Sequence, residues 1–424
     1  MRIQCATYNG HLGQGQSVLP PTDGREETEL ASWLSTTLAH PDGTAGPPDL
    51  VAVGFQEMIP LHLALAGFTS TALDLHQDKL KRAIEQTHSR SPRRDDKGET
   101  RETYSLVARK ALGGIALLVY SNDRTLTSQL DRVEIATAAC GIVNMMGNKG
   151  AVGIRVNMKQ GESWTFVTAH LAAHQNQVER RNRDWKEIVQ RLVFVDEANG
   201  NEHNLYETGH LFVFGDLNYR ISLTTPRKLA PHLLSHHISN LTSSLSDESS
   251  LTSSLATLLP HDQLQQQSRQ HKTLHHLAEA PITFAPTYKF KPGTRDTYKD
   301  FKKRIPGWCD RILYAVPTTA EVQVEMYRSE MDFTASDHKP VTAMFNIASK
   351  SKSHERLNVT SPYRISPTWR RSQQIGQALD RLVGIIWCLI VFAGFGKDAR
   401  WGIINLTGAA VGTLVWKGGW KLLA

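Results

Sequence analysis

Short apolar segments that each end in a polar residue constrain the fold of this 424-residue chain more than any other feature. Five of them are rich in β-branched and aromatic residues, which is typical of buried strands. They span residues 51–55, 114–120, 151–156, 164–170 and 211–216. Apolar residues at helical spacing occur at 27–39 and 177–195. Strands that alternate with helices predict an α/β fold, in which ligands collect at the carboxyl ends of the strands.

The composition narrows the kind of protein. Hydrophobic residues make up 40% of the chain and charged residues 21%, which argues against disorder throughout. The four cysteines are far apart and form no C-x-x-C pair, so neither a disulfide framework nor a zinc cluster is expected. The net charge of +7 suits an anionic partner, such as a phosphate, a nucleic acid or an acidic membrane surface. The first ten residues lack the apolar core of a signal peptide.

Polar residues with catalytic chemistry stand at the ends of the apolar segments. A lone residue of this kind is usually structural, but several from dispersed segments predict one shared site. They are Asn9, Glu57, His170, Asp216, Asn218, Asp310, Asp337 and His338. Carboxylate and amide oxygens suit Mg²⁺ rather than Zn²⁺ or copper. Mg²⁺ together with a carboxylate base and histidines indicates hydrolysis of phosphate esters.

Covalent and nucleotide-driven mechanisms lack their sequence signatures. The segment GNKG at 147–150 does not match the phosphate-binding loop G-x-x-x-x-G-K-[ST]. No G-x-S-x-G elbow occurs, and neither Cys140 nor Cys309 begins a C-x₅-R loop. Attack by an activated water is therefore favoured over a covalent intermediate.

Cations lie in the same segments as the catalytic candidates. They are Lys149, Arg220, Lys289, Lys303, Arg304 and Arg311, with Tyr288 among them. A run of cations is usually a solvated surface, but here the cations are interleaved with the carboxylates of the candidate metal site. This arrangement favours a pocket for a substrate with several phosphates.

Seven motifs, in order, resemble the inositol polyphosphate 5-phosphatase family of the endonuclease/exonuclease/phosphatase superfamily. They are GFQEM (54–58), GNKGAV (147–152), TAHLAAH (168–174), FGDLNYR (214–220), PTYKF (286–290), PGWCDRILY (306–314) and SDHKPV (336–341). The resemblance covers residues 1–346 and implies a two-sheet α/β sandwich with helices outside. Three departures occur: TYN at 7–9, PGW at 306–308 and Lys339 stand where the family usually has TWN, PSW and arginine. None of them removes a catalytic group.

The resemblance implies a role for each catalytic candidate. Asp216 would be the general base on the attacking water, and Asn218 would orient that water. His338, held by Asp310, would contact the scissile phosphate, and His170 would stabilise charge there.

The resemblance also implies the residues that hold the metal and the substrate. Glu57 would bind Mg²⁺ together with Asn9, and Asp337 would support the metal side. The residues expected to bind the substrate are Asn148, Lys149, His174, Arg220, Tyr288, Lys289, Lys303 and Arg304. All of these except Asn148, His174 and Arg220 would hold the neighbouring 4-phosphate, which fixes the ring so that the 5-phosphate meets the metal.

The chain divides into three expected regions. Residues 1–346 would form the catalytic domain, with a polar loop at 86–103 and a Ser-rich insertion at 236–256. Residues 347–381 would be a basic linker, and 382–424 a membrane-anchoring tail, because two uncharged runs span 382–396 and 401–416. The tail would cross the bilayer, enter it as a hairpin, or pack on the enzyme as an amphipathic segment.

These observations favour Mg²⁺-dependent hydrolysis of the 5-phosphate of phosphatidylinositol 4,5-bisphosphate, which leaves the 4-phosphate. The enzyme would be a monomer at the cytosolic face of an intracellular membrane, with the endoplasmic reticulum favoured and no nucleic acid as partner. Four alternatives stay open: a phosphatase for soluble inositol phosphates, an abasic-site endonuclease or DNase, a sphingomyelinase-like phosphodiesterase, and a non-catalytic tether that binds phosphoinositides.

Overall fold

A computed structural model describes most of the chain, namely residues 1–10, 46–88, 103–243, 247–299, 304–349 and 356–394. The helix expected at 27–39 lies outside these residues. So do Lys303, most of the expected polar loop and the tail after residue 394.

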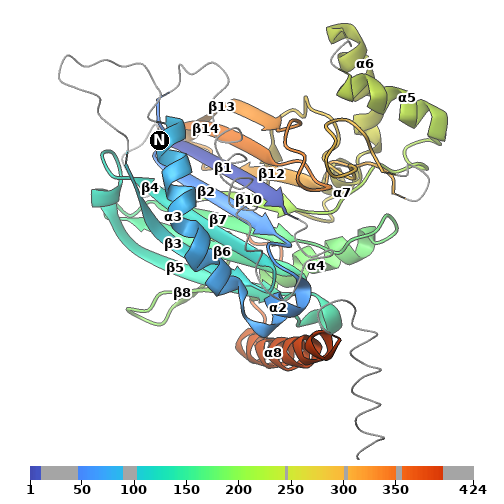
Figure 1. Ribbon diagram of the computed structural model, residues 1–424. Coiled ribbons are helices and arrows are strands. Elements are labelled where there is room, and N and C mark those ends of the chain that lie inside the picture. Colours follow the sequence, from blue (N-terminus) through green and yellow to red (C-terminus); the bar gives the residue numbers. More distant parts are fainter. Residues whose placement is uncertain (11–45, 89–102, 244–246, 300–303, 350–355, 395–424) are drawn as a thin grey trace, which may run out of the picture.

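Two six-stranded sheets form the framework (Figure 1). The first sheet has the order β13-β14-β1-β2-β4-β3. Its strands are β1 (Arg2–Asn9), β2 (Leu50–Gln56), β3 (Tyr104–Leu112), β4 (Ile115–Asn122), β13 (Ala320–Ser329) and β14 (Val341–Ser349). The second sheet has the order β11-β12-β10-β7-β6-β5. Its strands are β5 (Leu130–Ala139), β6 (Gly150–Met158), β7 (Ser163–His170), β10 (His210–Asp216), β11 (Ala278–Glu279) and β12 (Asp310–Ala315). A separate pair joins β8 (Phe194–Val195) to β9 (Glu202–His203).

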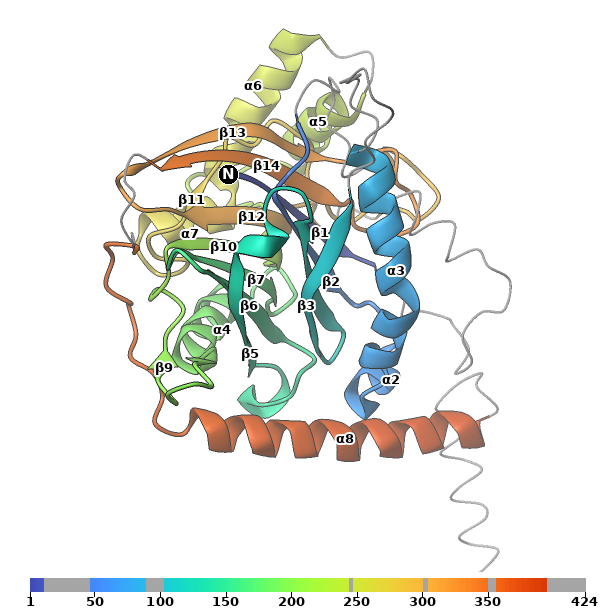
Figure 2. The ribbon, with the colours of Figure 1, turned by 90° about the vertical axis from the view of Figure 1, so that its left-hand side faces the viewer.

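Helices cover the outer faces of this sandwich (Figure 2). Helix α3 (Thr69–His88) lies on the first sheet, where Leu80 and Ile84 pack with Val51 and Val53. Helix α4 (Val178–Arg191) lies on the second sheet with its apolar face inward. The remaining helices are α2 (Leu61–Ala66), α5 (Pro231–Thr242), α6 (Glu248–Leu258), α7 (Gln263–Arg269) and α8 (Trp369–Ala393), with short 3₁₀ turns at η1 (Thr127–Gln129), η2 (Ile142–Asn144) and η3 (Leu259–His261). The predicted two-sheet α/β sandwich with outer helices is confirmed.

The largest core lies between the two sheets. Leu117 and Val119 of β4 pack there in one apolar cluster with Ile154, Phe166 and other residues of the second sheet. Gly54 in β2 marks the closest approach, because a Cβ at this position would lie 2.4 Å from Thr168 Oγ1 of the facing sheet. All five strands predicted from apolar segments are present, and each is buried along most of its length.

The helix expected at 177–195 ends earlier than predicted. Helix α4 stops at Arg191, and Phe194–Val195 instead forms strand β8. The apolar run continues past the helix because Phe194, in β8, packs in the core of the second sheet. Its ring lies under the guanidinium of Arg155 at 4.2 Å, and Gly153 leaves room for it.

Most of the described residues of the Ser-rich segment, 236–243 and 247–256, lie in helices α5 and α6. Helices α5 and α6 pack together as a hairpin, with Leu234, Ile238 and Leu258 buried. The side chain of Asp247 caps α6 by accepting from the backbone N of Ser250 at 2.9 Å. Apolar residues at helical spacing indicate these helices, but the Ser-rich composition of the segment hides that spacing.

The C-terminal helix begins inside the expected linker. Helix α8 starts at Trp369 and runs as one element through residue 381 to Ala393. Among the described residues it is the one helix long and apolar enough to cross a membrane, judged by length and composition. It lies against the lower edge of the sandwich in Figure 2.

We expect Gly54→Ala to destabilise the fold by about 1–3 kcal/mol, because the added methyl group overlaps Thr168 and Phe214. Urea unfolding followed by circular dichroism measures the change. The matched control is Gly46→Ala, whose Cβ would lie 3.5 Å from Arg2 and should shift stability by less than about 0.5 kcal/mol. Equal stability of the two variants would contradict the close approach of the sheets.

Candidate active site

The candidate site forms where two pairs of parallel strands end at the same edge. Asn9 and Gln56 are paired at the ends of β1 and β2. His170 and Asp216 are paired at the ends of β7 and β10, and Asp216 also faces Asp310 at the start of β12. Because the sheets are stacked, five segments far apart in the sequence deliver polar groups to one place, as the sequence predicted.

Asp216 is the centre of this group and is 1% exposed. Its Oδ2 accepts from Asn9 Nδ2 at 2.9 Å and lies 3.3 Å from His170 Nε2. Its Oδ1 accepts from the backbone N of Asn218 at 3.0 Å. The backbone of Asn218 has a positive φ of 58°, a strained conformation of a kind that clusters at functional sites.

His338 forms a second, connected unit. Its Nδ1 donates to Asp310 Oδ2 at 2.9 Å, and its Nε2 lies 3.9 Å from Asp216 Oδ2. Thr287 Oγ1 donates to the same oxygen of Asp310 at 2.6 Å. The imidazole therefore bridges two buried carboxylates and presents its Nε2 to Asp216.

The charges of this unit follow from its burial. Burial by itself would lower the pKa of His338, but Asp310 and Asp216 outweigh this effect and raise the pKa to about 9. Burial would likewise raise the pKa of Asp216, but His338 and His170 hold it far below its ordinary value. Burial raises the pKa of Asp310. The site thus contains an ionised Asp216 beside a protonated His338 at neutral pH.

Of the predicted metal ligands, Glu57 is partly exposed, whereas Asn9 and Asp337 are buried. Glu57 follows β2 with a positive φ of 50°, and its side chain is 39% exposed, unlike the buried Asp216. Its Oε1 lies 3.8 Å from His170 Nε2. Asn9 Nδ2 donates to Asp216, which holds the amide of Asn9 beside this carboxylate. Carboxylate and amide oxygens are ligands that fit a hard divalent ion.

A different set also satisfies the distances for a metal, namely Asp216, Asp310 and His338. Asp310 and Asp216 raise the pKa of His338, and a protonated imidazole has no lone pair for a metal, so a cation held here would rest on the two carboxylates.

Arg220, Tyr288 and His338 form a stack beside the cluster. The guanidinium of Arg220 lies 4.0 Å from the ring centre of Tyr288, whose ring lies 4.6 Å from that of His338. Arg220 also donates to Asn218 Oδ1 at 2.7 Å. The predicted substrate residues Arg220 and Tyr288 thus lie in the site, although each is at least nine-tenths buried.

Two predicted lysines contact different members of the site. Lys289 Nζ pairs with Asp337 and lies 5.3 Å from the ring centre of Tyr288. Lys149 contacts His170. Burial lowers the pKa of Lys149, and the charges of Glu57 and Asp216 oppose that effect. Lys149 is therefore close to the catalytic carboxylates themselves.

Other predicted substrate residues are used structurally or lie further out. Asn148 Oδ1 accepts from the backbone N of Ile142 at 2.9 Å, so this side chain braces its own loop. His174 is exposed, and its carbonyl accepts from Arg181 at 2.7 Å. Arg304 is exposed at the start of a described segment.

Arg311 does not belong to the site. It is fully buried and pairs with Asp262 at 3.0 Å and with Glu279 at 2.5 Å. Neighbouring side chains in a strand point to opposite faces, so Asp310 faces the site while Arg311 faces away.

Supporting residues that the sequence analysis missed lie beneath the cluster. Gln56 Nε2 donates to Thr168 Oγ1 at 2.9 Å and so joins the two sheets directly under the site. Ser336 Oγ donates to the carbonyl of Asn9 at 2.8 Å and ties the loop that carries His338 to β1. Polar residues at buried strand positions are the signal that could have found Gln56.

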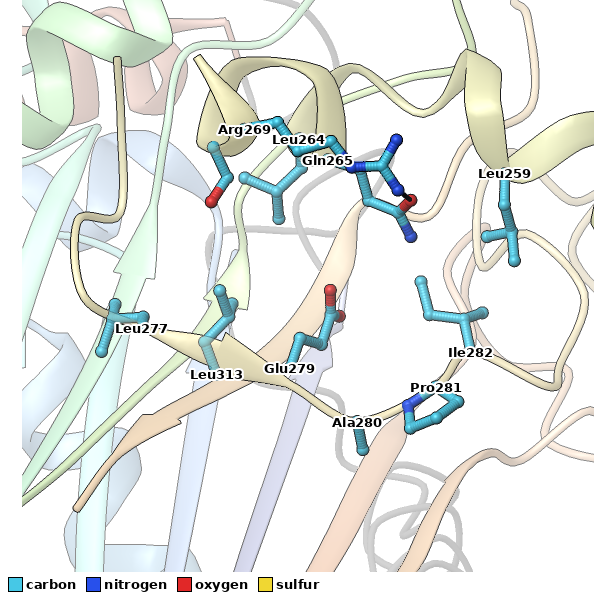
Figure 3. Close-up of a pocket in the computed structure, with 11 residues that line it drawn as sticks. Leu259, Leu264, Gln265, Arg269, Leu277, Glu279, Ala280, Pro281, Ile282 and Leu313 are labelled. Carbon is cyan, nitrogen blue, oxygen red and sulfur yellow. Dashed lines mark hydrogen bonds between the residues drawn. The ribbon is translucent and has the colours of Figure 1, made fainter. Parts of the chain in front are cut away.

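A cleft of about 350 Å³ lies elsewhere, between α7 and β11 (Figure 3). Its lining is mainly apolar, with Leu259, Leu264, Leu277 and Ile282 on its walls. Its one carboxylate, Glu279, is already bound by Arg311 and by Tyr327. It offers none of the chemistry of the strand-end cluster.

Comparisons with known proteins agree with this geometry. A model of endonuclease/exonuclease/phosphatase family 2 matches residues 7–344. The chain is 32% identical over 337 residues to the type II inositol 1,4,5-trisphosphate 5-phosphatase of Mus musculus. The aligned region covers 78% of this chain and 29% of that protein. It is 33% identical over 253 residues to the phosphatidylinositol 3,4,5-trisphosphate 5-phosphatase 1 of Homo sapiens. That aligned region covers 58% of this chain and 20% of that protein. The chain thus spans less than a third of the length of either relative.

Solved structures give the same result. The inositol polyphosphate 5-phosphatase domain of SPsynaptojanin, in complex with inositol (1,4)-bisphosphate and a calcium ion, is 25% identical, with a TM-score of 0.59. The match covers 90% of this chain and 89% of that one. A Cimex nitrophorin, 20% identical with a TM-score of 0.51 over 82% of this chain and 98% of the other, shares the fold.

The fold and the strand-end cluster define a protein of the endonuclease/exonuclease/phosphatase class. The chain belongs to endonuclease/exonuclease/phosphatase family 2. Within that class, the resemblance to inositol polyphosphate 5-phosphatases is confirmed by the relatives and by the domain structure.

The raised pKa of His338 predicts how stability depends on pH. A base whose pKa rises on folding stabilises the folded state fully below its unfolded pKa, near 6.5, and loses that contribution as pH rises through about 9. We therefore expect the free energy of unfolding to fall between these values, and His338→Gln to flatten the decline. Urea titrations at a series of pH values measure this effect. The exposed His232, replaced by Gln, is the control and should keep the wild-type slope.

Proposed function

We propose that this chain is a Mg²⁺-dependent 5-phosphatase that converts phosphatidylinositol 4,5-bisphosphate into the 4-phosphate. The observation that carries the proposal is the ionised, buried Asp216 at the meeting point of four strand ends, beside a protonated His338. The names of the relatives, all of them inositol or phosphoinositide 5-phosphatases, support the substrate class.

Asp216 is suited to accept a proton from the attacking water. The hydrogen bonds from Asn9 and from the backbone of Asn218 hold both of its oxygens in place. The side-chain amide of Asn218 donates to the carbonyl of Leu171 and accepts from Arg220, so Asn218 orients the water through Asp216. General base catalysis by a positioned carboxylate typically contributes about 10²–10⁴-fold to the rate.

His338 and His170 would stabilise charge on the scissile phosphate. His338 is cationic because of Asp310, and its Nε2 faces the same carboxylate that activates the water. His170 and Lys149 approach from the second sheet. A preorganised set of cations in a water-poor site stabilises charge that develops in the transition state.

Glu57 and Asn9 would hold Mg²⁺, and Asp337 would support that side through its pairing with Lys289. The ion, when bound, polarises the phosphate oxygens and so lowers the cost of the developing charge. The calcium ion in the related domain structure supports a divalent cation in that protein.

Specificity for the 5-phosphate would come from a grip on the 4-phosphate. The ring of Tyr288 lies 4.6 Å from that of His338, and Lys289 Nζ lies 5.3 Å from the ring centre of Tyr288, so a phenol and a cation stand near the catalytic imidazole. Lys149, Lys303 and Arg304 would complete the grip on the 4-phosphate. A second anchored phosphate fixes the ring and raises the effective concentration of the reacting group.

A lipid substrate fits the C-terminal part of the chain. Helix α8 is apolar enough for a membrane, and enzyme and substrate on one surface meet at high effective concentration. We propose that the enzyme works as a monomer on the cytosolic face of an intracellular membrane, with the endoplasmic reticulum favoured.

The deciding assay compares three substrates, with Mg²⁺ or with EDTA. It measures phosphate release from vesicles that contain phosphatidylinositol 4,5-bisphosphate and from soluble inositol 1,4,5-trisphosphate, and strand cleavage of abasic-site DNA. Mg²⁺-dependent release from the lipid with the 4-phosphate retained supports the proposal. Release from the soluble compound alone assigns the enzyme to soluble inositol phosphates, and cleavage of the DNA alone overturns the phosphatase.

Replacing Asp216 by Asn tests the general base. We expect turnover on the lipid vesicles to fall on the order of 10³-fold, with the circular dichroism spectrum unchanged, because the amide keeps the shape but cannot take the proton. Asp131→Asn is the control, since this carboxylate is about half exposed and should leave turnover at the wild-type level. Near-normal turnover of Asp216→Asn would refute the assigned role.

Replacing Lys289 by Ala tests the 4-phosphate grip. We expect kcat/KM to fall about 10–100-fold for substrates with a 4-phosphate and much less for those that lack it, through loss of a charge-assisted contact. The neighbouring Lys291 is exposed, and Lys291→Ala should leave both values unchanged. An equal loss on both kinds of substrate would contradict the grip.

A further inference from the structure

Helix α8 is fixed to the catalytic domain along its whole length. Near its start, Trp369 and Arg370 donate to Glu202 at 3.1 Å and 2.9 Å. Further along, Gln373 donates to Thr137 at 2.7 Å. Near its end, Cys388 lies 3.7 Å from the carbonyl of His62 in α2. The buried residues of α8 recur at Trp369, Gly376, Asp380 and Gly384, which is one stripe of a helix.

Two glycines bring α8 into backbone contact with the domain. A Cβ on Gly376 would lie 2.1 Å from the carbonyl oxygen of Met145, and a Cβ on Gly384 would lie 2.2 Å from the backbone N of Ala66. Any larger residue would force the helix away. The contacts are therefore specific to a docked helix.

Asp380 completes the attachment at its centre. Both of its carboxylate oxygens accept from the backbone N of Gly147, each at 3.0 Å, and the residue is 7% exposed. Gly147 precedes Asn148 and Lys149 of the candidate site. Helix α2, which contacts α8, begins four residues after Glu57. The helix thus touches both chain segments that lead into the catalytic cluster.

The outward face of α8 is apolar in its second half and cationic in its first. Its exposed large apolar residues are Ile375, Leu382, Val383, Ile385, Ile386, Trp387, Leu389 and Phe392, with Leu389 58% and Phe392 75% exposed. Arg371 and Arg381 are exposed as well, whereas Arg370 is paired with Glu202 of the domain. Leu61, Phe68, Ile142 and Val143, also exposed, lie in or beside α2 and η2, which α8 contacts or adjoins. Twelve of the fourteen exposed large apolar side chains among the described residues therefore gather at one edge.

We propose that α8 lies flat in the surface of an anionic phospholipid bilayer while it stays docked on the catalytic domain, and that it does not cross the bilayer. The exposed leucines and isoleucines would enter the acyl boundary, and the arginines would meet anionic headgroups. The placement of α8 on a bilayer is argued from its own contacts. It rests on the proposed function in one respect, namely that it would hold the active site at a surface that contains the lipid substrate.

Length and charge argue against a spanning helix. The uncharged run from Leu382 to Gly396 has 15 residues and reaches about 22 Å as a helix, less than the ~30 Å of a hydrocarbon core. A span that starts earlier would take in Asp380 and Arg381 and pull Asp380 off Gly147, and one that ends later would take in Lys397, Asp398 and Arg400. An in-plane helix keeps every contact named above.

The depth of two labelled positions distinguishes the orientations. Ala378 and Leu389 are both exposed and lie about 20° apart around the helix, but they are ~16 Å apart along its axis. We would place a fluorophore on Ala378→Cys or Leu389→Cys in the full chain carrying Cys388→Ser. Lipids brominated at different depths then quench the label in vesicles of phosphatidylcholine and phosphatidylserine.

An in-plane helix gives two depths that differ by less than half of the ~16 Å, and this result supports the proposal. A difference greater than half means that α8 crosses the bilayer and overturns it. Absence of vesicle binding, or a dimer that forms without vesicles and is lost with Leu389→Glu, also overturns it, because the face then serves another partner.

Charge placed on the outward face gives an independent measure. We expect Leu382→Glu with Leu389→Glu to weaken binding to these vesicles more than tenfold, while hydrolysis of soluble inositol 1,4,5-trisphosphate stays at the wild-type level. Leu233→Glu is the matched control, because this residue is 43% exposed on α5 at the opposite end of the molecule (Figures 1 and 2). Unchanged vesicle binding would overturn the proposal. A protein that binds vesicles but hydrolyses no substrate would instead overturn the proposed function alone.

Discussion

A buried negative charge at the end of β10 is the constraint on which the site depends. Asp216 is almost fully enclosed, and an isolated carboxylate in that position would be costly. Hydrogen bonds from Asn9 and Asn218, and the charges of two histidines, offset the loss of water. Each of these partners comes from a different segment, so the whole sandwich must be assembled before the charge is stabilised. The same partners keep Asp216 ionised, and an ionised carboxylate is what a general base requires.

The two sheets hold these partners in register through polar contacts in an apolar interior. Gln56 connects the end of β2 to Thr168 in the facing sheet, and Gly54, two residues earlier, allows the sheets to approach. Ser336 links the loop that carries His338 to Asn9. The positions of the catalytic atoms are therefore set by the packing of the sheets rather than by flexible loops, which favours a preorganised site.

Much of this arrangement was predictable, because strand ends are visible in sequence as apolar runs that stop at a polar residue. Asn9, His170 and Asp216 were found in this way. The failures have physical reasons. Arg311 looked like a substrate cation beside Asp310, but alternation along β12 turns it to the opposite face. Asn148 has the right position in its motif, yet its side chain is bound to the backbone of its own loop. Contacts of this kind depend on the fold of the whole chain and leave no local signal.

The C-terminal helix crosses a boundary that was placed from composition, because packing against the domain sets where the helix begins. The change from polar to apolar residues near position 382 suggested a linker followed by a tail, but helical geometry continues across that point because one stripe of α8 is complementary to the domain. Three residues on that stripe, Gly376, Asp380 and Gly384, contact the domain. In the sequence they appear only as small or charged residues that interrupt an apolar pattern. Once they are assigned to the domain, the apolar residues that remain belong to the opposite face. A helix held on one side by an enzyme and left apolar on the other is suited to lie between protein and lipid. Its inner face touches the segments before Lys149 and after Glu57, so the exposed apolar face of α8 and the candidate active site lie on neighbouring parts of the same domain.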